Sequence, residues 1–145
     1  ARMSGGDSYN AEQRQIGNAN TARASGMGKN ADVLQRQEGN RNVALLSGNV
    51  SFVAPEQRQI GDDNRSELNG VRGNESYASF YTKQVGDDNY SQLNADGNAG
   101  AFEVQQFGSG NTVNSAWGAD GNSATVRQFG NGNSANVTQG VITQP

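Results

Sequence analysis

The chain has 145 residues, of which 32% are hydrophobic and 17% charged, with a mean hydropathy of -0.80 and a net charge of -3. So polar a composition argues against a compact domain with a large hydrocarbon core, and the acidic balance argues against nucleic acid as the primary partner. The chain has no cysteine and no histidine, which excludes disulfides and the usual zinc, copper, haem and thiol-nucleophile sites. No apolar run approaches the length of a transmembrane helix, so a membrane-spanning segment is not expected.

The polar residues are mostly uncharged amides. The chain contains 19 Asn, 13 Gln and 20 Gly but only two prolines. Disordered chains usually stay open through charge or proline, whereas uncharged Asn- and Gln-rich chains pair into β-structure. The composition therefore favours an all-β fold without cofactor.

One hexapeptide, Gln-x-Gly-x-x-Asn, recurs six times along the chain. In chain order the copies span residues 15–20, 37–42, 59–64, 84–89, 106–111 and 128–133. From each Gln to the next, the sequence number advances by 22, 22, 25, 22 and 22. The invariant glutamines are Gln15, Gln37, Gln59, Gln84, Gln106 and Gln128. The invariant asparagines are Asn20, Asn42, Asn64, Asn89, Asn111 and Asn133. The glycines between them are Gly17, Gly39, Gly61, Gly86, Gly108 and Gly130.

Each hexapeptide is predicted to be a tight turn between two short strands, because Gly, Asn and Asp supply the positive-φ conformations that reverse a chain. Small and apolar residues recur two and four places after each Asn, as at Ala44 and Leu46, which is the period of an inward strand face. A second turn rich in Gly and Asn then leads to the next repeat. The expected organisation is a short segment at residues 1–7, six repeats over residues 8–139 and a tail at residues 140–145.

A repeat of about 22 residues cannot bury its inner face alone, but a stack of such repeats can. The fold predicted is thus a cross-β solenoid of six strand-turn-strand repeats, in which the Gln and Asn columns bond from rung to rung as amide ladders. Few residues remain to cover the first and last rungs, so both are expected to present unpaired strand edges. Such edges template a further copy, and head-to-tail contacts that do not close produce a fibre.

The pattern resembles the curlin repeat, most clearly over residues 128–139, and the resemblance extends over about residues 8–139. It implies a secreted bacterial subunit of curli fibres, an extracellular functional amyloid of the cell surface that serves biofilm matrix, adhesion and surface colonisation. It also implies homopolymerisation, a nucleating partner subunit, export through an outer-membrane pore and a signal peptide already removed from this sequence. The stretch 49–59 fits least well, because Pro55 falls on the inward register, where it would forfeit a ladder bond.

Three further features lie outside the ladders. The residue before each Gln is basic in five of the six repeats, which predicts an outward column that is either a solvated face or a stripe for anionic matrix polysaccharide or DNA. Asp62, Asp63, Asp87 and Asp88 fall in one corner of adjacent rungs and are candidate gatekeepers that slow stacking; a plain solvated turn and a calcium site are the alternatives. The apolar residue after most Gln is expected to fold back over the turn, the alternative being an exposed apolar column that bundles fibrils side by side. Trp117 is expected to fill the core or a corner, with a carbohydrate platform as the alternative.

The sequence thus predicts a structural protein and not an enzyme, with no catalytic, cofactor-binding or metal-binding residues. A monomeric β-solenoid that binds ice or glycans is the alternative, although its outward columns are charged and mixed. A parallel β-helix enzyme with paired carboxylates is a third reading, but nothing in the sequence converges on Asp62 and Asp87.

Overall fold

The fold is all-β, with every described element a strand. The computed structural model describes residues 2–4, 9–26, 31–48, 53–69, 78–95, 100–117 and 122–139. One strand of each repeat precedes the hexapeptide: β2 (Tyr9–Ile16), β4 (Ala31–Glu38), β6 (Val53–Ile60), β8 (Ala78–Val85), β10 (Gly100–Phe107) and β12 (Asn122–Phe129). The other follows it: β3 (Thr21–Gly26), β5 (Val43–Gly48), β7 (Arg65–Asn69), β9 (Tyr90–Ala95), β11 (Thr112–Trp117) and β13 (Ser134–Gln139). A short strand, β1 (Arg2–Ser4), comes first.

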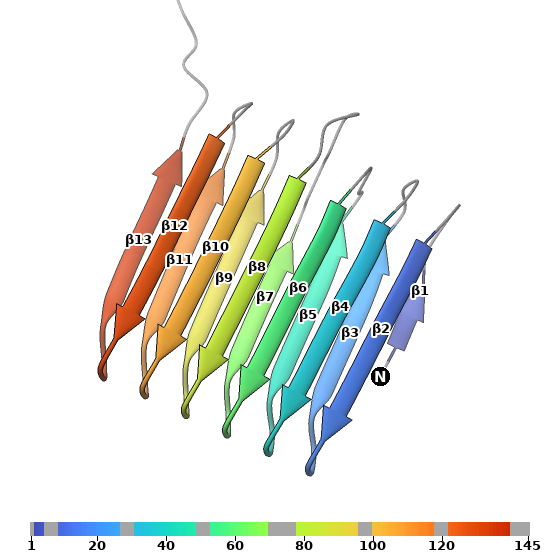
Figure 1. The fold of residues 1–145 in the computed structure, drawn as a ribbon, viewed down its shortest axis with the longest axis horizontal. Coiled ribbons are helices and arrows are strands. Elements are labelled where there is room, and N and C mark those ends of the chain that lie inside the picture. The colour runs from blue at the N-terminus through green and yellow to red at the C-terminus, as the bar shows by residue number, and fades with distance from the viewer. Residues whose placement is uncertain are drawn as a thin grey trace, which may run out of the picture.

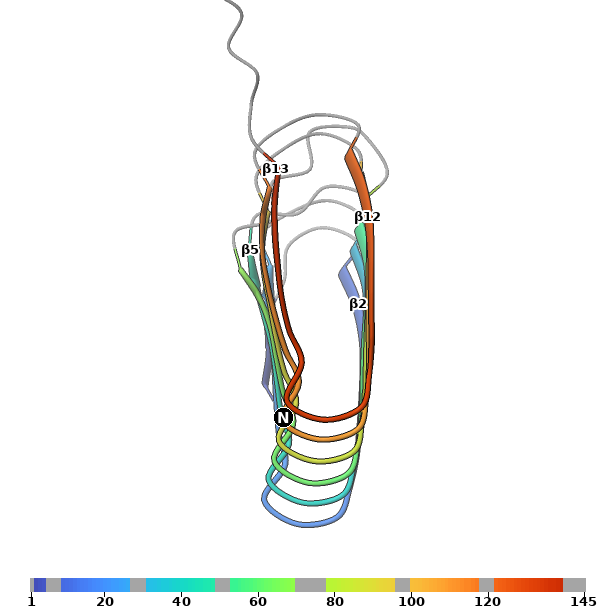
Figure 2. The ribbon, with the colours of Figure 1, turned by 90° about the vertical axis from the view of Figure 1, so that its left-hand side faces the viewer.

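The strands form two parallel sheets that face each other, as the prediction of a β-solenoid requires. The even-numbered strands make a six-stranded sheet, here the even sheet, and the odd-numbered strands make a seven-stranded sheet, here the odd sheet. Each strand pairs with the strand of its own kind in the next repeat (Figure 1), and the turns at the hexapeptides stack in a row (Figure 2). The chain is therefore a β-solenoid in which each repeat contributes one rung to the stack.

Register is kept through the longer third repeat. Gln59 pairs with Gln84 and Asn69 with Asn94, just as the equivalent residues of the other repeats pair with each other. The three extra residues consequently fall between the end of β7 and the start of β8, outside the two ladders. An insertion at that corner lengthens a connection and leaves every column aligned. An odd-numbered insertion within a strand would instead turn the inward side chains of that strand outward.

The interior is as much amide as hydrocarbon. Among the described residues, 11 hydrophobic and 15 polar side chains are buried. The hydrophobic ones include Leu46, Leu68, Leu93, Phe80 and Phe102, which form a single cluster between the sheets. Because so many buried groups are polar, each needs a partner inside the stack, and this requirement dictates the arrangement of the site below.

Pro55 is accommodated on a buried position of β6. The pairing of β6 with β8 begins at Val53, whereas its pairing with β4 begins only at Glu56, one residue after the proline. A proline nitrogen has no hydrogen to donate, so the ladder toward β4 starts beyond it. The structure thus agrees with the local loss of pairing expected from the sequence.

β1 is an element that the repeat pattern does not predict. It pairs in parallel with β3, with Arg2 opposite Arg23, Met3 opposite Ala24 and Ser4 opposite Ser25. The expectation that the first repeat leaves both of its strand edges open is therefore wrong for β3 over residues 23–25. It fits β2, whose only partner among the described strands is β4. None of the described residues belongs to a helix that could cross a membrane.

Candidate functional site: the amide ladders and the edges of the stack

The six glutamines of the hexapeptides form one continuous ladder. Each Nε2 donates to Oε1 of the next glutamine, at 2.7 Å from Gln15 to Gln37, 2.8 Å from Gln37 to Gln59 and 2.9 Å from Gln59 to Gln84. The series continues through Gln106 to Gln128 at 2.9 and 3.0 Å. The last five glutamines are buried. Each of these glutamines is the next-to-last residue of its even strand, and the alternation of side chains along the strand directs it inward.

The same amide groups also join the two sheets. Besides its neighbour in the ladder, Nε2 of Gln37 donates to the carbonyl of Thr21, and Nε2 of Gln59 to that of Val43, each at 3.0 Å. Gln84, Gln106 and Gln128 make the corresponding bonds to the odd strands. The amides of Gln37, Gln59, Gln84 and Gln106 thereby donate both along the stack and across it, so a glutamine displaced in either direction leaves a buried polar group unpaired.

The asparagines hold the turns together from rung to rung. Oδ1 of Asn42 accepts from the backbone N–H of Asn64 at 3.0 Å, and Nδ2 of Asn42 donates to the carbonyl of Gly61 at 2.6 Å. The same pair of bonds recurs from Asn20, Asn64, Asn89 and Asn111 toward the next repeat. At Asn133, the last member of the column, the side-chain amide bonds to Asn111 and to the carbonyl of Phe129, and the residue is exposed.

A second glutamine ladder is present that the sequence analysis did not identify. Gln13 donates to Gln35, and Gln35 to Gln57, each at 2.7 Å, two residues before the main ladder. It ends on the third repeat, where Gln57 bonds to the hydroxyl of Ser66, because Thr82, Val104 and Val126 take this position in the later repeats. The signal was in the sequence, since glutamine occupies the same place in three successive repeats.

The hexapeptide glycines adopt positive φ angles between 102° and 117°. A Cβ built on Gly17 would lie 1.9 Å from the carbonyl oxygen of Gly39, and one on Gly108 would lie 2.2 Å from that of Gly130. Both the backbone angle and the close approach of the next rung therefore require glycine. At Gly130 the nearest atom to such a Cβ is Nδ2 of Asn133 at 3.5 Å, so this hexapeptide glycine alone has room on its stacking side within the described residues.

The side chains of two of the four turn aspartates accept hydrogen bonds from the backbone of the preceding rung. Oδ1 of Asp62 accepts from the backbone N–H of Asn40 at 2.7 Å, and Oδ1 of Asp87 accepts from that of Asp62 at 2.8 Å. Asn40 and Asn131 supply the same acceptor elsewhere in the column. The carboxylates thus occupy an acceptor position that asparagine fills equally well, at the cost of placing like charges on adjacent rungs.

Asp63 and Asp88, the second pair, lie at φ 57° and 56°. Nε of Arg41 donates to Asp63 at 2.7 Å, and this ion pair holds the pKa of Asp63 below its usual value and raises the pKa of Arg41. No ion pair involves Asp88 in the described parts of the chain. Within those parts, no three His, Cys, Asp or Glu side chains gather where they could hold a metal.

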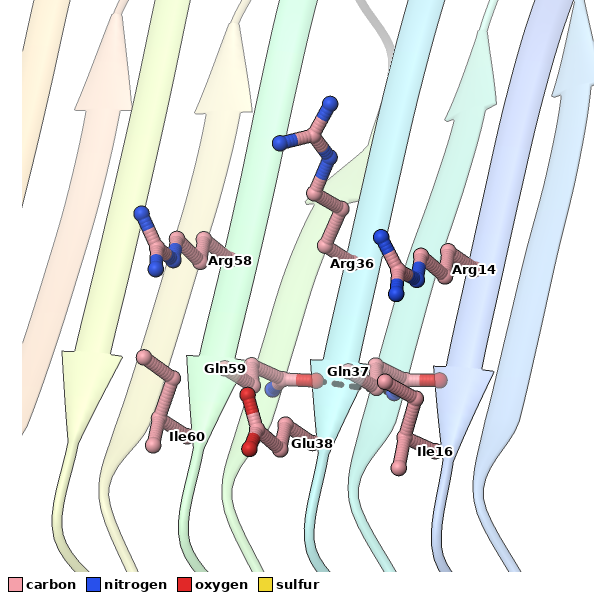
Figure 3. A pocket seen from close by; sticks show the side chains of 8 residues that line it. All are labelled: Arg14, Ile16, Arg36, Gln37, Glu38, Arg58, Gln59 and Ile60. Carbon is pink, nitrogen blue, oxygen red and sulfur yellow. Dashed lines mark hydrogen bonds between the residues drawn. The ribbon is translucent and has the colours of Figure 1, made fainter.

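The basic column lies outward on the even sheet. Arg14, Arg36 and Arg58 follow one another beside Ile16, Glu38 and Ile60 along a shallow groove (Figure 3). Arg36 lies 3.9 Å from Glu12 and Arg127 lies 3.3 Å from Glu103, both on the same face. Glu38, Glu56 and Asp32 also lie outward there, so the face carries carboxylates as well as cations. Because carboxylates are interspersed among the cations, the column is a weaker attractor for polyanions than a purely basic stripe would be.

The column after each glutamine points outward, which corrects the expectation that it folds back over the turn. Ile16 is 47% and Phe129 69% exposed, and the rings of Phe107 and Phe129 stack with centroids 5.2 Å apart. Nζ of Lys83 lies 5.1 Å from the centre of the Phe107 ring. Alternation explains the result: a residue that follows an inward glutamine on the same strand must face solvent. Trp117 is the last residue of β11, but its side chain lies outside the described part of the structure, so the expectation that it fills the core or a corner stays a prediction.

The outer face of the odd sheet differs in character over its last three strands. The described outward side chains of β9, β11 and β13 are all uncharged. They are Tyr90, Gln92, Asn94, Thr112, Asn114, Ala116, Ser134, Asn136 and Thr138. A shallow groove runs between Gln92, Asn114 and Asn136. The described part of this face therefore presents amides and hydroxyls in regular rows and carries no charged side chain.

The two edges of the stack carry complementary hydrogen-bonding groups. The last-repeat edge consists of β12 and β13, with Asn133 and Gln128 at the ends of their ladders. The first-repeat edge consists of β2 and of β3, which β1 covers over residues 23–25, and Gln15 and Asn20 begin the two ladders there. Inside the stack, each asparagine accepts from the backbone N–H of the next asparagine and donates to the carbonyl of the next glycine. Asn133 therefore presents the groups that Asn20 and Gly17 would match.

One comparison with known proteins gives a match. The family model described as the curlin associated repeat matches residues 119–140, which include β12, the last hexapeptide and β13. No curated protein and no solved structure matches the chain. The matched segment is the one in which the sequence pattern is closest to the curlin repeat. The chain therefore contains a curlin-associated repeat, in agreement with its resemblance to the curlin family.

Proposed function

We propose that this protein is the structural subunit of an extracellular, curli-like amyloid fibre that grows by head-to-tail stacking of its solenoid. The proposal rests on the complementarity of the two edges. A second copy placed one rung beyond β12 and β13 would let Gln128 donate to Gln15 and let Asn133 bond to Asn20 and Gly17. These are the bonds that already join every pair of rungs within the chain.

The energetic argument favours association over an isolated stack. Each buried amide left without a partner costs about 1–3 kcal/mol, while each bond formed contributes about 1 kcal/mol net. An unpaired parallel edge is in addition a template for another strand. Apart from the three residues of β3 that β1 covers, these edges are satisfied by copies of the chain, and because the contact is head to tail it does not close.

The curlin resemblance supports the cellular side of the proposal. It is consistent with secretion, a fibre at the bacterial surface, export through an outer-membrane pore and a separate nucleating subunit. Roles in the biofilm matrix, in adhesion and in surface colonisation follow from such a fibre. A family of structural proteins is also consistent with the proposal that the chain is not an enzyme.

Gly130 gives the sharpest test of head-to-tail growth. Gly130→Ala introduces a methyl group that meets no atom of the described residues closer than 3.5 Å, but at a junction it would lie about as close to Gly17 of the next copy as a Cβ on Gly108 would lie to Gly130. The variant should add to a growing end and then block it. A few per cent of the variant, mixed with wild-type protein, should therefore reduce elongation from wild-type seeds, measured by sedimentation.

Gly132→Ala is the matched control. It also places alanine at a positive φ, 69°, but the equivalent Cβ on Gly110 would lie 3.9 Å from the next rung, an ordinary contact. It should leave seeded elongation unchanged in the same mixtures. A Gly130→Ala variant that polymerises alone as fast as wild type would refute stacking at this edge. A variant that simply failed to fold would be inert in the mixture and would not poison growth.

A monomeric binding module for neutral glycans is the second candidate, supported by the uncharged outer face of β9, β11 and β13. Rows of amides and hydroxyls at the rung spacing of about 4.8 Å could bond to the hydroxyls of a linear polysaccharide. Sedimentation equilibrium together with calorimetric titration of a soluble β-glucan distinguishes the two. A stable monomer that binds the glucan would favour the module, and polymerisation without glucan would favour the fibre subunit.

A further inference from the structure

The two sheets do not contain the same number of strands. The odd sheet has seven and the even sheet six, and the additional strand is β1, at the β3 edge of the stack (Figure 1). β1 pairs with residues 23–25 of β3, whereas β2 has no described partner on the corresponding side. At the first-repeat edge, therefore, one strand is covered and the other is open among the described residues.

β1 lies where a neighbouring copy would have to bind. Within the chain each repeat adds one strand to each sheet, so that β10 and β11 are followed by β12 and β13. A junction with the same geometry places β12 of one copy on β2 of the next, and β13 on β3. The place on β3 that β13 requires is the one that β1 occupies.

A junction that retained β1 would be defective. If β13 paired with β1 instead, the odd sheet would gain one strand more than the even sheet between the two copies. β12 and β2 would then be separated by a vacant strand position, because neighbouring strands lie about 4.8 Å apart. Their facing edges, each belonging to a strand of eight residues, would stay unpaired next to the core, where unpaired backbone groups are costly.

We propose that β1 is an autoinhibitory strand that covers the first-repeat edge, and that a second copy adds only after β1 leaves β3. This inference rests on the proposed fibre function. β1 covers three residues of β3, while β13 and β3 each have six, so the incoming strand replaces a short pairing by a longer one. Thr21 and Ala22, next to the turn, are not paired with β1 and provide the place where β13 can begin to displace it.

A reversible crosslink tests the inference. In Ser4→Cys/Ser25→Cys the two residues lie opposite each other in register, at a separation of about 4.8 Å that a disulfide can span. The chain has no other cysteine, so the crosslink is unique. The oxidised variant should not extend wild-type seeds, and the same sample after reduction should extend them at the wild-type rate. Ser25→Cys alone, kept reduced, is the control for the substitution.

A complementary variant weakens β1 instead of locking it. Replacing Arg2, Met3 and Ser4 together by proline removes every backbone donor of the strand, so β1 can no longer hold its place. This variant should shorten the lag of unseeded assembly several-fold relative to wild type. An unchanged lag would overturn the inference.

The outcomes separate this inference from the function on which it rests. If the oxidised variant extends seeds as fast as the reduced one, or if the two thiols do not couple, β1 does not guard the edge, although the fibre proposal stands. If neither the wild-type protein nor the reduced variant extends seeds, the fibre proposal itself fails.

Discussion

At the scale of single residues, position within the repeat decides what a side chain does. Gln105 and Gln106 are adjacent and chemically identical. Gln106 points inward and bonds to Gln84, Gln128 and the carbonyl of Tyr90, whereas Gln105 points outward and bonds to Glu103 on its own strand. Burial makes the first set of bonds consequential, because unpaired amides cannot recover hydrogen bonds from water.

Gln106→Ala should therefore be far more damaging than Gln105→Ala. The first variant leaves the carbonyl of Tyr90 and the neighbouring amides with fewer partners, and we expect it to lose about 2 kcal/mol or more of unfolding free energy. The second should lie within about 0.5 kcal/mol of wild type, as surface substitutions usually do. Urea denaturation of both variants measures the difference. Equal losses would contradict a stabilising role of the ladder, and the same comparison applied to fibre growth tests its role in assembly.

Ser115 shows the opposite situation, a buried hydroxyl with no hydrogen-bond partner within the described structure. It takes a place in the inward column where Leu46, Leu68 and Leu93 precede it. Ser115→Ala should raise the unfolding free energy by about 1 kcal/mol, because it removes an unpaired buried polar group. Ser66→Ala is the control: its hydroxyl accepts from Gln57 at 3.0 Å, so this variant should be destabilised. The same sign of change in both would contradict the interpretation.

At the scale of elements, the hexapeptide turn is the part of the repeat with the strictest requirements. Its first positive-φ position is always glycine, because a Cβ there would collide with the next rung. The second, two residues later, is Ala19, Arg41, Asp63 and Asp88 in the first four repeats and glycine in the last two. The turn therefore admits charged residues at the second of these positions and not at the first.

The Arg41–Asp63 pair should make turn stability depend on pH at the acidic end. The pKa of Asp63 is lowered in the folded state, so its contribution is present above the ordinary carboxyl pKa of about 3.9 and is lost as pH falls through the lowered value. Asp63→Asn should flatten the pH dependence of the urea midpoint below about pH 4. Asp88→Asn, at the same turn position without a described ion pair, should leave that dependence closer to wild type.

The aspartates of the third and fourth turns remain candidate gatekeepers. Replacing Asp62, Asp63, Asp87 and Asp88 by Asn removes like charges from adjacent rungs and keeps an acceptor oxygen at Asp62 and Asp87. We expect the quadruple variant to assemble with a shorter lag at neutral pH, followed by light scattering, and the difference to shrink in high salt, where charges are screened. An unchanged lag would remove the gatekeeper hypothesis.

At the scale of the whole molecule, the stack has a direction. Both glutamine ladders donate from lower to higher residue numbers, and the two edges carry the two halves of the main ladder. A fibre built from such units is polar. β1 adds a further asymmetry, since it covers part of one edge only.

Fibre diffraction of the purified protein checks the assembled architecture. Stacked rungs should give a meridional reflection at about 4.7–4.8 Å, and the two packed sheets should give an equatorial reflection at about 10 Å. Soluble β-rich monomers after prolonged incubation at micromolar concentration would instead indicate that the edges stay covered. A soluble disordered chain would indicate that folding awaits a nucleating partner.

Much of this architecture follows from local sequence, because a solenoid repeats one short unit. The hexapeptide fixes the turn through glycine, and the period of two fixes which of Gln105 and Gln106 faces inward. Repetition at a near-constant interval then aligns identical side chains, so the β-solenoid and its two main columns can be read without a structure. The ladder of Gln13, Gln35 and Gln57 was readable by the same logic.

Tertiary structure alone decided the features that depend on contacts between non-equivalent parts. The pairing of β1 with β3 joins a segment outside the repeat pattern to the edge of the stack, and no periodicity encodes it. The outward stacking of Phe107 on Phe129 depends on side-chain packing across neighbouring rungs. The sequence by itself thus determined the repeating unit and its register, because both are local and periodic. The structure decided which strands lie at the edges of the stack, because an edge strand is one that lacks a neighbour on one side.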